Sequence, residues 1–238
     1  MFAITPNILS NFMISLSRYV ILLSLVLISV SIFLIIFLEN DYYQGISFKI
    51  MFIHVPTAWL SLAIFLVMGI SSIVGLIFKS PTAFTVARSL SPIGLIMSII
   101  VLVTGSIWGN LTWGAYWVWD ARLTSELILL FLYLGYMALQ SAFENKRIAA
   151  RAGAILALIG VINIPIIHYS VEWWSTLHQG PTITKLDKPS IHITMLIPLI
   201  FMVLAFKTFY IMTALIRARS EILEYEYNSS WAKKILGN

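Results

Sequence analysis

Six stretches of the chain are apolar and long enough to cross a membrane as helices, which need about 20 mostly apolar residues each. They run approximately over 19–38, 50–78, 89–107, 122–142, 149–168 and 192–216. The 238 residues are 60% hydrophobic and only 11% charged, whereas soluble domains carry roughly 25% charged residues. We therefore predict an all-α polytopic membrane protein with six transmembrane helices, forming a single membrane domain over 1–238.

The first apolar run is expected to remain in the protein as a span. It is longer than the apolar core of a signal peptide, which has roughly 7 to 15 residues. The polar residues that follow it, Glu39, Asn40 and Asp41, provide no small-residue cleavage site.

The chain contains no cysteine, which excludes disulfides, thiolate metal sites and thiol redox catalysis. Its formal net charge is +5, a value that could suggest nucleic-acid binding. Basic loops on one side of a membrane explain this charge more simply. We therefore expect contact with membrane lipid and no nucleic-acid partner.

Lysines and arginines are distributed unequally between the two sides of the predicted membrane domain. One side receives four of them, namely Lys49, Arg122, Lys185 and Lys188. The other side receives ten, namely Arg18, Lys79, Arg88, Lys146, Arg147, Arg151, Arg217, Arg219, Lys233 and Lys234. Since the positive side is usually cytoplasmic, both termini are predicted to be cytoplasmic, or on the equivalent matrix side. The segment 108–121, the start of the second span and the loop 169–191 then face outward.

The outward segment 108–121 is rich in tryptophan. It contains the run Trp113-Gly114-Ala115-Tyr116-Trp117-Val118-Trp119-Asp120. Four large aromatic side chains at a membrane surface are suited to a flat aromatic ligand, and we expect this ligand to be haem. Two simpler interpretations exist: Trp and Tyr form aromatic belts at membrane interfaces without any ligand, and Asp120 is well placed to cap the next helix.

Histidines are the candidate ligands of a haem iron, because imidazole is a common axial ligand. Two of the four, His54 near the outward end of the second span and His178 in the loop before the sixth, are both outward and could ligate opposite faces of one porphyrin. His168 and His192 are more simply explained as hydrogen-bonded bystanders. Spacing alone does not decide between His168 and His178.

Arg122 and Glu126 are four residues apart at the start of the fourth span. This spacing allows them to pair along one helix face. Arg122 is also suited to a haem propionate, since guanidinium binds carboxylate in a bidentate manner. Both interpretations remain open at the level of the sequence.

Three motifs together resemble a known family. The run 113–120 is similar to the tryptophan-rich signature of haem-handling membrane proteins in cytochrome c maturation, with Tyr116 where Trp is frequent. The segments 52–56, 121–127 and 167–180 support the resemblance, which covers roughly 40–215 and is most similar to the haem exporter protein C (CcmC) family. The resemblance implies six spans and an outward haem site with His54 and His178 as axial ligands. It also implies that Trp113, Gly114, Tyr116, Trp117, Trp119, Asp120 and Arg122 surround the haem.

The resemblance further implies the task and the partners. Such a protein holds b-type haem as cargo at the outer leaflet and delivers it to a membrane-anchored haem chaperone, CcmE. The other expected partners are the ABC transporter subunits CcmA and CcmB and the small subunit CcmD. The expected location is the bacterial inner membrane with the haem site facing the periplasm, or alternatively the mitochondrial inner membrane. The sequence has no P-loop and no evident acid–base group besides the histidines, so we expect a haem-transfer factor and not an enzyme.

Three competing classes differ in observable ways. An ion-coupled transporter needs ionisable groups within its spans, where only Glu126 and Lys207 are found. A cytochrome c synthase shares the tryptophan-rich signature but usually has more spans or a large outward domain. A structural adaptor anchored by its aromatic residues would be colourless when purified.

Overall fold

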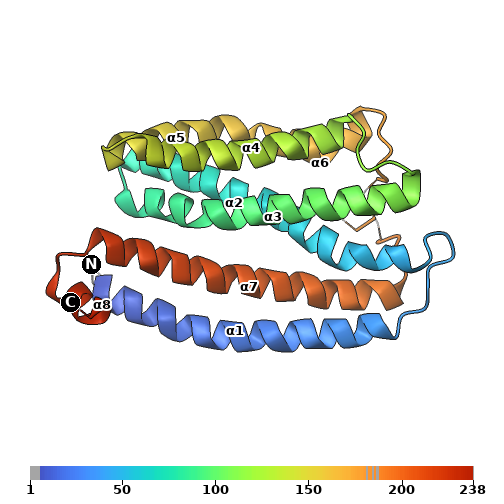
Figure 1. Ribbon diagram of the computed structural model, residues 1–238, viewed down its shortest axis with the longest axis horizontal. Helices are drawn as coiled ribbons and strands as arrows, with labels where there is room; N and C mark the ends of the chain where they lie inside the picture. Colours follow the sequence, from blue (N-terminus) through green and yellow to red (C-terminus); the bar gives the residue numbers. More distant parts are fainter. Residues whose placement is uncertain (1–5, 181, 184, 186–187, 238) are drawn as a thin grey trace.

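The computed structural model describes residues 6–180, 182–183, 185 and 188–237, and these residues form a bundle of long helices (Figure 1). The helices are α1 (Pro6–Ile36), η1 (Ile46–Ile50), α2 (Met51–Phe78), α3 (Pro81–Trp113), α4 (Ala121–Ala142), α5 (Lys146–Val161), α6 (Asn163–Trp173), α7 (Ile193–Tyr225) and α8 (Ser230–Leu236). Six helical segments, counting η1 with α2 and α5 with α6, are long and apolar enough to cross a membrane. This finding confirms the predicted all-α polytopic architecture.

Several helices are longer than the apolar runs from which they were predicted. α1 begins at Pro6 and not near residue 19, and α7 continues to Tyr225. α3 continues to Trp113, so that only 114–120 of the expected loop 108–121 lies outside a helix. The physical reason is that apolar composition marks the part of a helix suited to lipid, whereas backbone hydrogen bonding continues until a residue caps the end.

The fifth span is divided into α5 and α6 at Ile162. The amide of Ile162 donates to the carbonyl of Ile159, three residues earlier, at 3.3 Å. Pro165, in the first turn of α6, has no amide hydrogen to continue the regular bonding pattern. The buried Asn163 Nδ2 donates to the Ser125 carbonyl at 2.8 Å and thereby fixes the break against α4.

α1 and α7 lie side by side along most of their length (Figure 1). Four serines at intervals of seven residues are buried along α1: Ser10, Ser17, Ser24 and Ser31. Small side chains of this kind allow two membrane helices to approach closely. Ser24 Oγ donates to the Ala205 carbonyl at 3.1 Å, and Ser31 Oγ donates to the Pro198 carbonyl at 3.0 Å.

The main core lies between α2, α3, α4 and α5 and is centred on Tyr133 of α4. Its side chain is fully buried and meets the ring of Phe65 edge to face, with ring centres 5.0 Å apart. The Tyr133 hydroxyl donates to the Ser61 carbonyl at 2.7 Å. Gly94 of α3 faces the Tyr133 ring so closely that a Cβ atom at this position would lie 2.2 Å from Tyr133 Cζ.

The start of α1 and the helix α8 lie at one end of the bundle, and the segments 37–45, 114–120, 174–180 and 188–192 lie at the other (Figure 1). Ion pairs join three helices at the end that carries the termini. Arg88 Nε of α3 lies 2.9 Å from a Glu221 oxygen of α7, and Lys146 Nζ of α5 lies 3.0 Å from a Glu224 oxygen of α7. The opposite end contains the candidate site.

Candidate functional site

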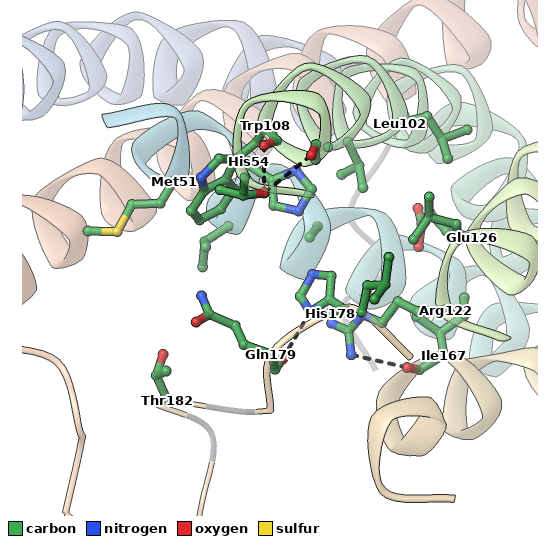
Figure 2. A pocket seen from close by; sticks show the side chains of 18 of the residues that line it. Met51, His54, Leu102, Trp108, Arg122, Glu126, Ile167, His178, Gln179 and Thr182 are labelled. Carbon is green, nitrogen blue, oxygen red and sulfur yellow. Dashed lines mark hydrogen bonds between the residues drawn. The ribbon is translucent and has the colours of Figure 1, made fainter. Parts of the chain in front are cut away.

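A cavity of about 270 Å³ is lined by residues near the segments 37–45 and 114–120, at the end of the bundle opposite the start of α1. One water molecule needs only about 10–15 Å³ of such space, so the cavity is large enough for a small-molecule ligand. Its walls come from α2, α3, α4, α6, α7 and the segment after Trp174 (Figure 2). His54, His178, Trp113, Trp117 and Arg122 are among the residues that line it.

α2 and α3 together position His54, which lies in the first turn of α2. Its Nδ1 atom is 3.0 Å from Thr104 Oγ1, and its ring meets Trp108 edge to face with ring centres 5.7 Å apart. Trp108 Nε1 in turn donates to Gln44 Oε1 at 2.9 Å. A Cβ atom on Gly105 would lie 3.0 Å from His54 Cε1, so the absence of a side chain there allows the imidazole to lie against α3. Three neighbouring residues of α3, Thr104, Gly105 and Trp108, therefore position the His54 ring.

The structure brings His178 to the opposite side of the cavity from His54 (Figure 2). The two imidazole ring centres are 6.5 Å apart and the ring planes are inclined by 32°. His178 Nδ1 lies 2.9 Å from the Gln179 carbonyl, which only accepts hydrogen bonds, so Nδ1 carries the hydrogen and Nε2 has a free lone pair. Trp113 of α3 meets the His178 ring at 6.2 Å.

Burial lowers the pKa of His178 below the ordinary value of histidine, and the positive charge of Arg122 lowers it further. The hydrogen bond to the Gln179 carbonyl and the charge of Asp120 act in the opposite direction but are smaller effects. His178 is therefore neutral at pH 7, which is the form of imidazole that binds metal.

Two of the four aromatic side chains in the tryptophan-rich run line the cavity, and two do not. Trp113 and Trp117 form part of the cavity wall. Tyr116 is 63% exposed and Trp119 is 78% exposed, although Trp119 meets Trp117 edge to face at 5.4 Å. In the described structure the run therefore contributes two residues, Trp113 and Trp117, to the cavity wall and presents Tyr116 and Trp119 at the surface.

Gly114 and Asp120 shape the backbone on either side of this run. Gly114 ends α3 with φ of 75°, a left-handed conformation that glycine adopts without strain. Asp120 Oδ1 accepts a hydrogen bond from the Leu123 amide at 2.8 Å and caps α4, which confirms the predicted capping role. Among the described residues, Asp120 Oδ2 and Trp117 Nε1 are buried and have no hydrogen-bond partner.

Arg122 and Glu126 both line the cavity, but their polar atoms have different partners. Arg122 Nη1 donates to the Ile167 carbonyl at 3.4 Å, and Arg122 takes part in no ion pair among the described residues. Glu126 Oε1 accepts from Ser61 Oγ at 3.2 Å and from Ser98 Oγ at 3.1 Å. The direct pair that the spacing allowed is not formed, and the Arg122 guanidinium remains available to a carboxylate in the cavity.

The other two histidines occupy different positions. His168 lines the cavity and meets Tyr169 edge to face, with ring centres 4.7 Å apart. His192 caps α7: its Nδ1 atom lies 2.8 Å from Thr194 Oγ1 and accepts from the Thr194 amide at 3.4 Å. His192 is not part of the cavity wall.

Sequence reasoning missed three residues that adjoin His54, namely Thr104, Gly105 and Trp108, and also Gln44, which accepts a hydrogen bond from Trp108. One indication of Trp108 was present in the sequence, because this residue stands at the start of the expected outward loop 108–121. Thr104 and Gly105 stand inside an apolar run, and hydropathy does not show which face of that helix meets the second span. Only the packing of α3 against α2 identifies them.

Comparisons with known proteins agree with the resemblance. A family model described as Heme exporter protein C (CcmC) matches residues 2–233. A protein named Heme exporter protein C from Haemophilus influenzae is 49% identical over 214 residues, which are 90% of this chain and 87% of that protein. The protein of the same name from Escherichia coli K12 is 46% identical over 200 residues, 84% of this chain and 80% of its own.

A relative from a plant source is also similar. A putative cytochrome c biosynthesis ccmC-like mitochondrial protein from Marchantia polymorpha is 42% identical over 191 residues, 79% of each chain. The family model extends over nearly all of the sequence, and these relatives match most of it at 42% to 49% identity. The chain therefore belongs to the Heme exporter protein C (CcmC) family.

Proposed function

We propose that the chain takes part in cytochrome c maturation by holding haem at the outer face of the membrane and delivering it to the haem chaperone CcmE. In this proposal it works with the ABC transporter subunits CcmA and CcmB and the small subunit CcmD. The observation that carries the proposal is the pair of imidazoles, His54 and His178, which face each other across the cavity at 6.5 Å.

The separation of the two rings suits one metal ion between them. Imidazole nitrogens bind transition metals at about 2 Å, and roughly 1.1 Å separates such a nitrogen from its ring centre, so two axial imidazoles have ring centres about 6 Å apart. The observed 6.5 Å is close to this value. His54 and His178 are accordingly the proposed axial ligands, and ligation on both faces leaves no position for oxygen, which suits a carrier.

The walls of the cavity support an aromatic, hydrophobic cargo. Ligand pockets are mostly apolar with a few placed polar groups, and here Trp113 and Trp117 provide aromatic surface beside the two imidazoles. Trp117 Nε1 is a buried donor that has no partner within the described part of the chain, and a bound group with acceptor atoms would supply one. Haem held in this way is bound non-covalently and is released when another ligand replaces one histidine on the iron.

We propose that the end of the bundle with the cavity faces outward and that both termini are cytoplasmic. The excess of Lys and Arg on the side of the termini supports this orientation. The bacterial inner membrane is the proposed location, and the mitochondrial inner membrane is the alternative that the Marchantia relative keeps open.

An absorbance spectrum tests the proposal. The full chain is purified in detergent from cells supplied with haem, and spectra are recorded in the oxidised and reduced states. We expect low-spin haem with two nitrogen ligands, and transfer of this haem to purified CcmE when the two proteins are mixed with the transporter subunits. A colourless protein would contradict the proposal and favour the structural adaptor.

Arg122 is expected to bind a propionate of the haem. Replacing it by Gln should weaken haem binding by about 10- to 100-fold, since a hydrogen bond to a charged group contributes about 1.5–3 kcal/mol. The measurement is a titration of the protein with haem and with its dimethyl ester, which has no carboxylates. The loss should be present for haem and absent for the ester.

Arg147 provides the matched control, because it is an exposed arginine at the end of the bundle that carries the termini. Arg147→Gln should bind both ligands as the unmodified protein does. Equal weakening of haem and ester by Arg122→Gln would show that Arg122 acts on the fold and not on a propionate.

A further inference from the structure

Thr104 is the one side chain within hydrogen-bonding distance of His54 among the residues that the structure describes, and it comes from a different helix. His54 Nδ1 and Thr104 Oγ1 are 3.0 Å apart. The hydroxyl of Thr104 has its own acceptor one turn earlier on α3, the Ile100 carbonyl at 2.6 Å. A hydroxyl has a single hydrogen to donate and two lone pairs with which to accept.

The direction of the bond to His54 follows from this count. Thr104 Oγ1 is closer to the Ile100 carbonyl, at 2.6 Å, than to His54 Nδ1, at 3.0 Å, so we assign its hydrogen to Ile100 and its oxygen as the acceptor on the side of His54. Nδ1 of His54 therefore carries the ring hydrogen, and Nε2 has the lone pair. Gly105 and Trp108 hold the plane of the same ring, so that the hydrogen bond and the packing together define its orientation.

His178 reaches the same protonation pattern in a different way. Its Nδ1 atom is paired with the carbonyl of the next residue, Gln179, inside the loop. That contact keeps the tautomer but does not tie the ring to another helix. Thr104, in contrast, links His54 of α2 to α3 across 50 residues of sequence.

We propose that Thr104 is a positioning residue that keeps His54 in the tautomer with hydrogen on Nδ1 and so presents Nε2 to the cavity as a metal ligand. The inference rests on the proposed function for the identity of the metal, the iron of haem. An imidazole that donates its other ring hydrogen to a partner is a more basic ligand, and loss of such a partner typically costs about 10- to 100-fold in metal affinity.

The test compares Thr104→Val, which keeps the shape but removes the oxygen, with Thr104→Ser, which keeps the hydroxyl. Thr85→Val is the matched control, because Thr85 also lies on α3 and donates to a carbonyl four residues earlier, that of Pro81 at 3.1 Å. We expect Thr104→Val to bind ferric haem about 10- to 100-fold more weakly and to have a more positive midpoint potential. Thr104→Ser and Thr85→Val should retain the affinity and potential of the unmodified protein.

A second measurement needs no haem. Nitrogen NMR of the protein labelled at histidine, with the His54 signal assigned from a His54→Gln variant, reports which ring nitrogen carries the hydrogen. We expect Nδ1–H in the unmodified protein and in Thr104→Ser, and a mixture of tautomers in Thr104→Val. Identical tautomers in all variants, or an equal loss of affinity in Thr104→Val and Thr104→Ser, would overturn the role of Thr104. Absence of haem binding by the unmodified protein would instead refute the proposed function, while the NMR result would still decide the role of Thr104.

Discussion

Replacing His54 by alanine is expected to lower the affinity for haem by more than about 100-fold, because even partners outside the metal's own ligands contribute about 10- to 100-fold. Either replacement should abolish the low-spin spectrum, because only one of the two axial histidines would remain. Replacing His178 by alanine should also lower the affinity for haem. Its effect on affinity should be smaller than that of His54→Ala. The reason is that His54 is held by Thr104, Gly105 and Trp108, whereas His178 lies in a loop.

The measurement is a haem titration followed by absorbance in both oxidation states, together with transfer of haem to CcmE. His192→Ala is the matched control, because His192 caps α7 and is not part of the cavity wall. It should cost about 1 kcal/mol of stability through loss of the cap and should leave the haem spectrum unchanged. Full loading of CcmE by the His54→Ala, His178→Ala double variant would contradict the assignment of both ligands.

Replacing Gly94 by alanine is expected to lower the free energy of unfolding by about 1–3 kcal/mol, the usual cost of overfilling a packed core. The new Cβ atom would lie 2.2 Å from Tyr133 Cζ and 2.3 Å from Tyr133 Oη. Tyr133 has little freedom to move away, because its hydroxyl is bonded to the Ser61 carbonyl and its ring contacts Phe65. A displaced Tyr133 would also disturb Ser61, whose hydroxyl donates to Glu126 in the cavity wall.

Thermal unfolding in detergent measures this effect, and Gly135→Ala is the control. A Cβ atom on Gly135 of α4 would meet one atom within 4 Å, the flexible end of Leu156 at 3.1 Å. This variant should unfold close to the temperature of the unmodified protein. Equal unfolding temperatures for Gly94→Ala and Gly135→Ala would show that the contact between α3 and Tyr133 is less restrictive than the structure indicates.

Local features of the chain were predictable from the sequence because their causes are local. The apolar runs identify the six membrane helices, since the thickness of the apolar layer sets the length of each run. The capping role of Asp120 was predictable in the same way, because its carboxylate reaches an amide only three residues later. The family was recognisable because its motifs are short continuous segments around Trp117 and the two histidines.

Features that depend on the rotation of helices about their axes were not predictable. Arg122 and Glu126 are correctly spaced for a pair along one helix face, yet Glu126 accepts from Ser61 and Ser98 on two other helices. Tyr116 and Trp119 belong to the same short run as Trp113 and Trp117, yet they are exposed. The contacts of Glu126 join residues from separate helices, whereas the exposure of Tyr116 and Trp119 depends on the path of the segment 114–120 between α3 and α4. Hydropathy contains no information about either.

The sequence by itself therefore determined the class of protein, the number of spans, the family and the two histidines that the family implies. Tertiary structure alone decided that the rings of His54 and His178 lie 6.5 Å apart across one cavity and that Thr104 directs the lone pair of His54 into it. The physical reason is the range of the interactions. Burial in lipid and helix capping act within one segment, whereas a site with two opposed imidazoles exists only after α2, α3 and the loop before α7 have packed together.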